Sequence, residues 1–444
     1  MSRNWILVLA LPAAAVAQTA LTLPDAVRMA LEKHPSLEAA AAQGKAAETR
    51  IGQAKAGMLP RVTYNESFQT SNNPVFAFGT LLTQRRFAES NFAIDSLNKP
   101  GFVNNFQSQL QVEQLLYDFG GLKAQVRAAE LGKKMSDEEE RALRLRRAVE
   151  VAGRYHGANL AAESIAVAEA AVKSAEADLA RAEAVRDAGM STDADVLTIR
   201  VHLAGRQEDL IRRKYDLDVA LAALNEALGM PLDTAWQLAT PLTVAPDPVA
   251  GADAELEART SRPELRQAEI GFHVAESQRD AARAARLPQI VARGMFEADR
   301  GRFVTQAGAN WFFGAGLRWN LFTGNADKRR VEEASHAMVA ATARRKEAAA
   351  GIALHVRRAR SAVLSAGERV KVADASIAQA EESLRIMRNR YQAGLATVSD
   401  LLRNETALLD ARTRRLAAVH DQRVASIALE YAKGTLTGDS NVLQ

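Results

Sequence analysis

The chain has 444 residues, of which 48% are hydrophobic and only 5% aromatic, and Ala, Arg, Glu and Leu dominate long tracts. This composition is typical of long helices and coiled coils. The 57 basic and 53 acidic residues nearly cancel, and no compact basic cluster is interleaved with aromatic residues, so the sequence does not favour a nucleic-acid-binding protein.

The N-terminus has the pattern of a signal peptide, which we place at residues 1–17. Arg3 gives a positive start, Trp5–Leu11 form an apolar core, and Ala15–Ala17 fit the small-x-small pattern before a cleavage site. The alternative is a buried N-terminal helix. The apolar run is too short to span a bilayer, and no later stretch is long and apolar enough for a membrane helix. The sequence contains no Cys, so neither disulfides nor a lipid-bearing cysteine is expected.

The sequence contains an internal duplication. Several landmarks occur twice, in the same order: HPSL at 34–37 and RPEL at 262–265, MLPRV at 58–62 and RLPQI at 286–290, LLYDFGG at 115–121 and LFTGNA at 321–326, GMSTDAD at 189–195 and GLATVSD at 394–400, and a single glycine at 229 and 434. A repeat of this kind predicts two copies of one structural unit.

Long helices are predicted after the glycines of the LLYDFGG and LFTGNA landmarks, Gly120 and Gly324. Pro is excluded from helix interiors, and none occurs between residues 100 and 231 or after residue 288. The segments 120–189 and 324–394 would each form a helix of roughly 100 Å. A shorter return helix is expected after each. In the first return helix, hydrophobic residues recur with a coiled-coil period at Val196, Leu203, Leu210, Leu217 and Leu224.

Strands are predicted between the proline landmarks and the long helices, where the hydrophobic period changes to two. The segments with this alternation are 106–113 and 311–320, with weaker patterns at 62–68 and 290–296. Each strand would have one apolar and one largely polar face. Trp311 and Trp319, at the ends of one strand, suit the interfacial girdles of a membrane barrel, whereas the alternative is a half-buried soluble hairpin.

Four strands per chain cannot close a barrel, and lipid does not tolerate open sheet edges. Membrane barrels begin at about 8 strands, so two or three copies of the chain are needed. A barrel of about 8 strands is filled by its own side chains, so the passage of a solute favours at least three copies.

Together these duplicated landmarks resemble the TolC-like outer membrane efflux channel family, over nearly the whole mature chain. The resemblance implies an α+β membrane protein and a homotrimer. Each chain would give four strands to one 12-stranded β-barrel in outer-membrane lipid, continued by a long α-helical barrel of coiled-coil hairpins in the periplasm. It also implies a tripartite efflux or type I secretion system, in which the channel docks onto an inner-membrane transporter through a periplasmic adapter (membrane fusion) protein and conducts passively.

The landmarks also divide the chain into segments. In order we expect a signal peptide (1–17), a first-repeat N-terminal helix (18–60), a first β-hairpin with a long extracellular loop (61–117), a first long helical hairpin with its tip near residue 189 (118–230), an equatorial linker (231–260), a second-repeat helix (261–287), a second β-hairpin (288–322), a second long helical hairpin with its tip near residue 394 (323–434) and a C-terminal tail (435–444). The linker is rich in proline and is expected to be a loop with one short helix.

Each break between a long and a short helix has an explanation in local chemistry. In the second break, Gly394 suits the left-handed turn that ends a helix. Thr397 would cap the next helix, and Asp400 stands in a capping-box-like position, where its charge also suits a helix N-terminus. The first break repeats these residue types with Gly189, Thr192 and Asp195. Both breaks are therefore predicted to be tight helical turns.

The resemblance assigns a gate to these turns, because the tips of a trimer would form the inner mouth of the tunnel. Asp400 matches one of the family's constriction aspartates by motif position, and Arg403 occupies the position of the second. Three copies would place a positive ring beside a negative one. The two rings could neutralise each other, so the ion selectivity stays open.

The resemblance also assigns contacts between the two hairpins that hold the mouth closed. Tyr391 and Asp195 match a phenol–carboxylate hydrogen bond of the family. A second family contact, from an Arg to a hydroxyl, would need positions 194 and 396, and both are Ala here. We therefore expect fewer such contacts and easier opening. The tip residues expected to dock the adapter are Gly189, Met190, Thr192, Gly394, Leu395 and Thr397.

Other chemistry is not indicated by the sequence. The seven histidines form no H-x-x-x-H or H-E-x-x-H pair, and no phosphate-binding loop or G-x-S-x-G motif occurs. The sequence therefore predicts no enzyme, no metal site and no cofactor. Two alternatives to a channel are a periplasmic adapter, which would have one helical hairpin flanked by small β domains, and an exported structural coiled-coil protein, which would lack the strands.

Overall fold

The computed structural model describes residues 19–245, 253–304 and 306–444. The signal peptide predicted at 1–17 lies outside these residues. The chain divides into a helical unit, made of Met1–Ala40, Glu140–Leu265 and Ala349–Gln444, and a strand unit, made of Ala41–Glu139 and Arg266–Ala348. Among the described helices, none combines the length and the apolar character needed to cross a membrane.

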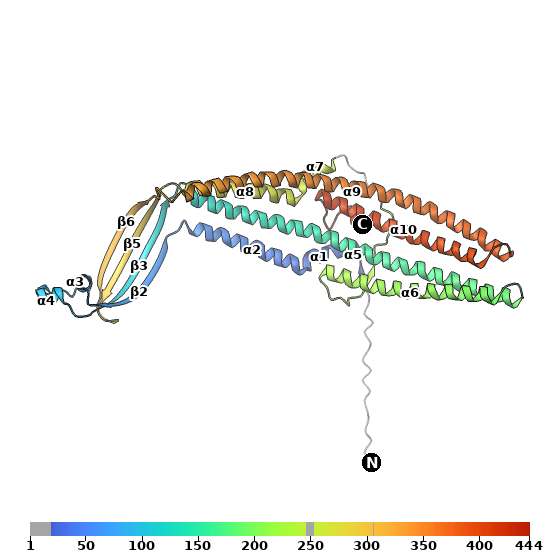
Figure 1. Cartoon of the computed structure of the whole chain (residues 1–444), viewed down its shortest axis with the longest axis horizontal. Helices are drawn as coiled ribbons and strands as arrows, with labels where there is room; N and C mark the ends of the chain where they lie inside the picture. The colour runs from blue at the N-terminus through green and yellow to red at the C-terminus, as the bar shows by residue number, and fades with distance from the viewer. Residues whose placement is uncertain (1–18, 246–252, 305) are drawn as a thin grey trace, which may run out of the picture. The chain divides into compact units, whose positions relative to one another are not determined.

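The main helices occur in pairs of equal length, one helix from each repeat. α2 (Pro35–Ala56) and α8 (Pro263–Ala284) each have 22 residues, α5 (Gly121–Asp187) and α9 (Ala326–Gln392) each have 67, and α6 (Asp193–Leu228) and α10 (Val398–Lys433) each have 36. At the rise of an α-helix, α5 and α9 are each roughly 100 Å long. The predicted internal duplication and the predicted long helical hairpins are therefore confirmed, and Figure 1 shows α5–α6 and α9–α10 as the two hairpins.

The strand unit contains one antiparallel sheet with the strand order β2-β3-β5-β6 (Figure 1). Its strands are β2 (Arg61–Ser71), β3 (Val103–Tyr117), β5 (Gln289–Arg300) and β6 (Gly308–Arg318). Because side chains alternate between the faces of a strand, paired residues across the sheet share a face. One such row across the four strands is Tyr64, Leu110, Phe296 and Trp311, and the next is Asn65, Gln109, Glu297 and Asn310. One face of the sheet is thus largely apolar and the other largely polar, as its alternating sequence predicts, although Glu66 and Arg300 form an ion pair on the largely apolar face.

The segment between β2 and β3 was expected to be a long loop, but it has helical structure of its own. It contains α3 (Pro74–Thr83), the 3-10 helix η1 (Glu89–Phe92) and α4 (Ile94–Asn98). The Asn73 side chain caps α3 by accepting hydrogen bonds from two backbone N–H groups of its first turn. The rings of Phe78, Phe87 and Phe92 pack edge to face, with centroids 4.9 and 5.1 Å apart, and give the segment an apolar cluster.

The core of the helical unit gathers around two short strands that the sequence did not reveal. β1 (Thr19–Leu21) and β4 (Trp236–Leu238) pair in parallel, and β4 lies in the segment expected to be a linker. The hydroxyl of the fully buried Tyr155 donates to the carbonyl of Leu21 at 2.8 Å and accepts from the N–H of Thr240 at 2.9 Å. Helix α5 is thereby fixed to the strands. The remaining helices of this unit are α1 (Leu23–Lys33), α7 (Ala254–Ser261) and the 3-10 helix η2 (Asn441–Leu443).

Candidate functional site at the helical tips

Each long helix ends in a tight turn at a glycine with left-handed backbone geometry. The φ angle is 75° at Gly189 and 72° at Gly394. The residue after each glycine donates its N–H to a carbonyl five residues back, at 3.0 Å for Met190 and 2.8 Å for Leu395. This is the hydrogen bond of a Schellman motif, which satisfies carbonyls at the end of a helix. The predicted role of both glycines as turn residues is confirmed.

Each return helix begins with a capping box. The Thr192 hydroxyl accepts from the N–H of Asp195 at 3.2 Å, and the Asp195 carboxylate accepts from the N–H of Thr192 at 3.3 Å. Thr397 and Asp400 repeat the two bonds at the same distances. Hydrogen bonds from the threonine hydroxyls are the largest cause of the lowered pKa of both carboxyls. The predicted caps are confirmed.

Asp400 and Arg403 pair with each other within one chain. Nη1 of Arg403 lies 3.4 Å from Oδ1 of Asp400, while Oδ2 of Asp400 accepts from the Thr397 hydroxyl at 2.7 Å. Both carboxylate oxygens therefore have partners, one in the cap and one in the ion pair. A carboxylate held in this way presents less free negative charge to a passing ion than an unpaired one.

Tyr391 and Asp195 lie in one cavity of about 620 Å³ lined by residues of both tips, but the direct hydrogen bond expected between them is absent from the described residues. Oδ2 of Asp195 accepts instead from Thr192 and from the Ser191 hydroxyl at 3.1 Å. Burial and then the charge of Asp195 raise the pKa of the Tyr391 phenol, and a hydrogen bond with Ser191 opposes this shift. Ser191 thus lines the same cavity as both groups, donates to the Asp195 carboxylate and lowers the pKa of the Tyr391 phenol, while the cap of α6 also occupies the carboxylate.

An apolar cluster joins the two hairpins next to this cavity. Its buried members come from both hairpins and are Ala182, Val196, Ile199 and Val398. Tyr391 and Leu402 pack against it from the second hairpin. Val196 begins the heptad pattern of the first return helix, and Leu402 recurs with Leu409 and Leu416 at the same spacing in the second. The first residue of each pattern therefore lies at the contact between the hairpins.

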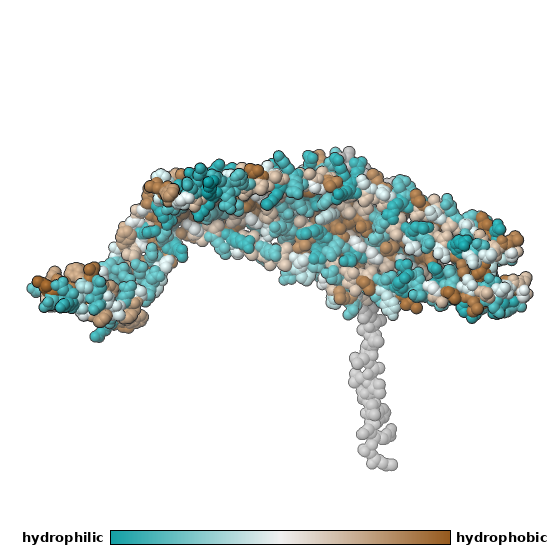
Figure 2. Space-filling view, viewed as in Figure 1, coloured by the Kyte–Doolittle hydropathy of each residue, from teal (hydrophilic) through white to brown (hydrophobic). Residues whose placement is uncertain are grey.

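Two large apolar side chains are exposed at the ends of the hairpins. Met190 is 75% exposed and Leu395 is 68% exposed, each directly after the glycine of its turn. Figure 2 shows hydrophobic surface at this end of the two hairpins. Both belong to the six tip residues that the sequence analysis expects to dock the adapter.

A group of charged residues further along the hairpins was missed by sequence reasoning. Asp178 and Glu405 are buried carboxyl groups that lie among buried apolar residues of α5 and α10. The available signal was their spacing, since Asp178 falls between Ala175 and Ala182 on one helical face and Glu405 falls four residues after Leu401. In the described part of the chain, no group of three or more His, Cys, Asp or Glu side chains is placed to hold a metal ion.

A sheet with one apolar and one polar face, joined in one chain to two long helical hairpins, defines a membrane channel subunit with a helical extension. The chain belongs to the outer membrane efflux protein family, whose profile matches residues 26–230 and 256–435. The two matched blocks follow the two repeats. This membership confirms the predicted family and its outer-membrane localisation, and it decides against the periplasmic adapter and the structural coiled coil.

Similar proteins and structures agree with this assignment. Protein CyaE of Bordetella pertussis is 28% identical, over 94% of this chain and 86% of its own length. The alkaline protease secretion protein AprF of Pseudomonas aeruginosa is 25% identical, over 94% of this chain and 85% of its own length. The Campylobacter jejuni CmeC outer membrane channel has a TM-score of 0.80 at 17% identity and covers 95% of this chain and 87% of that chain. The predicted α+β fold is confirmed, and the family and these relatives are transport proteins rather than enzymes.

Proposed function

We propose that three copies of this chain form one outer-membrane channel, which receives its substrates from an inner-membrane transporter and a periplasmic adapter protein. The observation that carries the proposal is the four-stranded sheet. Within the described strands, β2 and β6 each pair on one side only. Lipid does not tolerate open sheet edges, so the outer edges of β2 and β6 need partner strands from further copies.

Three copies of the sheet give a barrel wide enough to conduct. A barrel of about 8 strands is filled by side chains, so a third copy is needed to open a lumen. The polar face of β3, with Gln107, Gln109 and Gln111, supplies a lining that water can wet. Tyr64, Leu110 and Trp311 on the opposite face suit contact with lipid.

The substrates fall in the range that such relatives export. AprF of Pseudomonas aeruginosa and PrtF of Dickeya chrysanthemi are named for protease secretion, and OpmQ of Pseudomonas putida for pyoverdine export. We place this chain in a type I secretion or tripartite efflux system of the same kind. In such a system the channel is passive, and the transporter selects the substrate.

The gate of this channel lies at the helical tips. Opening requires the tip of α9–α10 to move away from the tip of α5–α6. Two contacts between the tips hold them together and oppose this motion. One is the apolar cluster around Val398, and the other is the connection from Tyr391 through Ser191 to Asp195. The Asp400–Arg403 pair tunes ion selectivity at the mouth, and the exposed Met190 and Leu395 dock the adapter.

Disulfide trapping tests the assembly directly, because the chain has no Cys of its own. One Cys is scanned along β2 and a second along β6, and outer membranes are extracted with detergent. At matching registers we expect a covalently closed trimer that survives boiling in SDS and collapses to monomer on reduction. The single-Cys variants are the control and should run as monomers after heating. A chain that stays soluble and monomeric after membrane fractionation would contradict the channel.

A further inference from the structure

A buried network of charged side chains joins the two hairpins of the helical unit. Asp178 on α5 and Glu405 on α10 have side chains only 1% and 8% exposed. Nη2 of Arg388 on α9 donates to Oε1 of Glu405 at 2.7 Å and to the hydroxyl of Ser174 on α5 at 2.6 Å. The same nitrogen lies 3.7 Å from Oδ2 of Asp178. One arginine thus bridges the first hairpin to both helices of the second.

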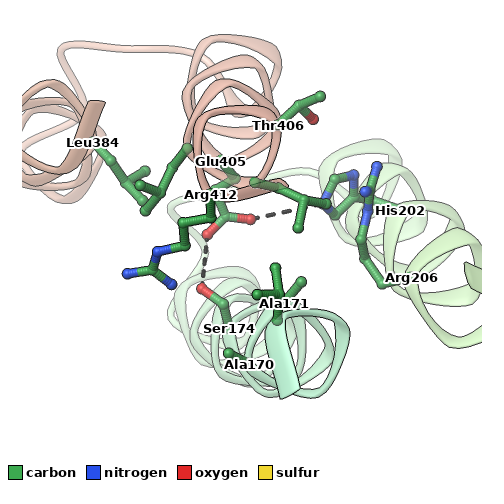
Figure 3. A pocket seen from close by; sticks show the side chains of 12 residues that line it. Ala170, Ala171, Ser174, His202, Arg206, Leu384, Glu405, Thr406 and Arg412 are labelled. Atoms are coloured by element: carbon green, nitrogen blue, oxygen red, sulfur yellow. Dashed lines mark hydrogen bonds and ion pairs between the residues drawn. The ribbon is translucent and has the colours of Figure 1, made fainter. Parts of the chain in front are cut away.

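The fourth helix, α6, completes the surroundings of this network. Nε2 of His202 lies 3.7 Å from Oε2 of Glu405, and the Ser174 hydroxyl donates to Oε1 of Glu405 at 3.1 Å, as Figure 3 shows. Arg206 of α6 and Arg412 of α10 line the same small cavity of about 50 Å³. All four helices of the two hairpins therefore contribute a polar or charged group.

These neighbours give only one of the two carboxylate oxygens of Asp178 a hydrogen bond. Its Oδ1 accepts from Nη1 of Arg181 at 2.6 Å, but its Oδ2 is buried and accepts no hydrogen bond from any described residue. A buried carboxylate oxygen without a hydrogen-bond donor lowers the stability of the folded state. Oδ2 of Asp178 and Oε1 of Glu405 both approach Nη2 of Arg388, at 3.7 and 2.7 Å, so the two carboxyls are close neighbours, and a protonated Asp178 could donate a hydrogen bond to Glu405.

Burial and the neighbouring Glu405 favour a protonated Asp178 near neutral pH. Burial, and then Glu405, raise the pKa of Asp178 to about 7, against the opposing effect of Arg388 and Arg181. Burial, and then Arg206, lower the pKa of His202, so this histidine does not supply a compensating charge at neutral pH. When both carboxyls lose their protons, two buried negative charges repel each other.

We propose that Asp178 and Glu405 share one proton and form a latch that holds the two hairpins together, and that loss of this proton loosens the latch. The inference rests on the proposed function, in which separation of the hairpin tips opens the channel. In the closed latch, protonated Asp178 donates to Glu405, and Arg388 and Ser174 hold Glu405 in place. In the open state both carboxyls meet water, and Asp178 loses its proton at the pKa of an ordinary aspartate.

The direction of the pH dependence follows from proton linkage. The closed state binds the proton with a pKa of about 7, whereas a solvated aspartate binds it with a pKa of about 4. Between these values the closed state holds one more proton, so it is favoured as pH falls. Well below the closed-state pKa, one proton changes the equilibrium about tenfold per pH unit, and at pH 7 the closed state is already half deprotonated. Opening at pH 5 is therefore about 50-fold rarer than at pH 7, with little change above pH 8.

Two measurements on the full-length trimer test the latch. Single-channel recording gives the open probability between pH 5 and pH 8. Spin labels on Met190→Cys and Leu395→Cys, in a chain without other Cys, give the separation of the tips over the same range. In both we expect a shift toward the closed state as pH falls below about 7. If the labels respond but no conductance is seen, the latch holds and the channel function fails.

Asp178→Asn is the decisive variant, because its amide can donate to Glu405 at every pH. It should remain closed throughout and lose the pH dependence. Glu176→Gln, which removes an exposed carboxyl two residues away on α5, is the matched control and should keep the wild-type profile. The proposal is overturned if Asp178→Asn keeps the pH dependence of the tip separation, or if wild-type tips do not respond to pH.

Discussion

Gly434 lies directly against the backbone of Arg262, the residue before the proline that begins α8. A Cβ atom at position 434 would stand 3.0 Å from the backbone nitrogen of Arg262, and the glycine has a φ of 78°. The first repeat has the same contact, because a Cβ on Gly229 would stand 3.2 Å from Cα of His34. The end of each return helix is thus packed against the start of the short helix in its own repeat.

This contact predicts that Gly434→Ala destabilises the protein strongly. A non-glycine residue in the left-handed region costs about 1–2 kcal/mol, and crowding against backbone adds about 1–3 kcal/mol. We expect a loss of about 2–5 kcal/mol, seen as a lower temperature of helix melting by circular dichroism. Gly438→Ala is the matched control, because a Cβ there meets open space and the φ is not left-handed. Equal shifts for the two variants would disprove the packing argument.

Local sequence rules predicted the parts of the site that depend on near neighbours. A glycine followed by a threonine and then an aspartate predicted the turn at 394 and the cap at 397, because a Schellman turn and a capping box need only a few adjacent residues. Proline spacing and the change of hydrophobic period predicted the helices and strands for the same reason.

Features that depend on the three-dimensional packing could not be predicted in this way. Strands of three residues, such as β1 and β4, are too short to show a hydrophobic period. The sequence around Gly434 likewise gives no sign of its contact with Arg262, which lies far away along the chain. Comparison by position predicted a direct Tyr391–Asp195 bond, but it did not account for the competing cap or for Ser191 between them. Asp178 was overlooked because a carboxylate in an alanine-rich helix is usually solvated.

The second prediction concerns the ion pair at the tips. In the proposed trimer, Arg403→Ala leaves three Asp400 carboxylates without their arginines, so the mouth becomes more negative. We expect a shift of the reversal potential toward cation selectivity in a salt gradient, and a change of stability below about 1 kcal/mol because the pair is exposed. Arg385→Ala removes an equivalent exposed pair, with Glu382 on α9, and should leave the reversal potential unchanged. Unchanged selectivity in Arg403→Ala would exclude Asp400 from the mouth.

The third prediction separates the gate from the helix cap. Ser191→Ala removes the connection between Tyr391 and Asp195 but leaves the capping box intact, so we expect a higher open probability with little loss of stability. Tyr391→Phe should have the same effect, and the double variant should add nothing further, because both break one connection. Asp195→Ala is less informative, since loss of the cap costs about 1 kcal/mol by itself.

The control for this series is Ser376→Ala, which removes an exposed hydroxyl bonded to the carbonyl of its own helix. Its open probability should match the wild type. An additive effect of Ser191→Ala and Tyr391→Phe would show that the two residues act on the gate separately and not through one connection.

The fourth prediction starts from a buried histidine in the middle of α5. His156 is 0% exposed, and neither ring nitrogen has a hydrogen-bond partner among the described residues. Burial, and then the charges of Arg423 and His420, lower its pKa to about 4. The folded protein therefore holds this imidazole neutral under conditions in which an unfolded chain would protonate it.

Stability should consequently fall as the pH is lowered from about 6.5 to about 4, by up to about 3 kcal/mol from this group. Asp178 acts with the opposite sign in part of this range, so the test compares variants. His156→Phe removes the titrating ring, and its melting temperature should fall less than that of the wild type over this range. The exposed His336→Phe should follow the wild type. If His156→Phe instead loses stability in parallel with the wild type, acid denaturation begins at another group.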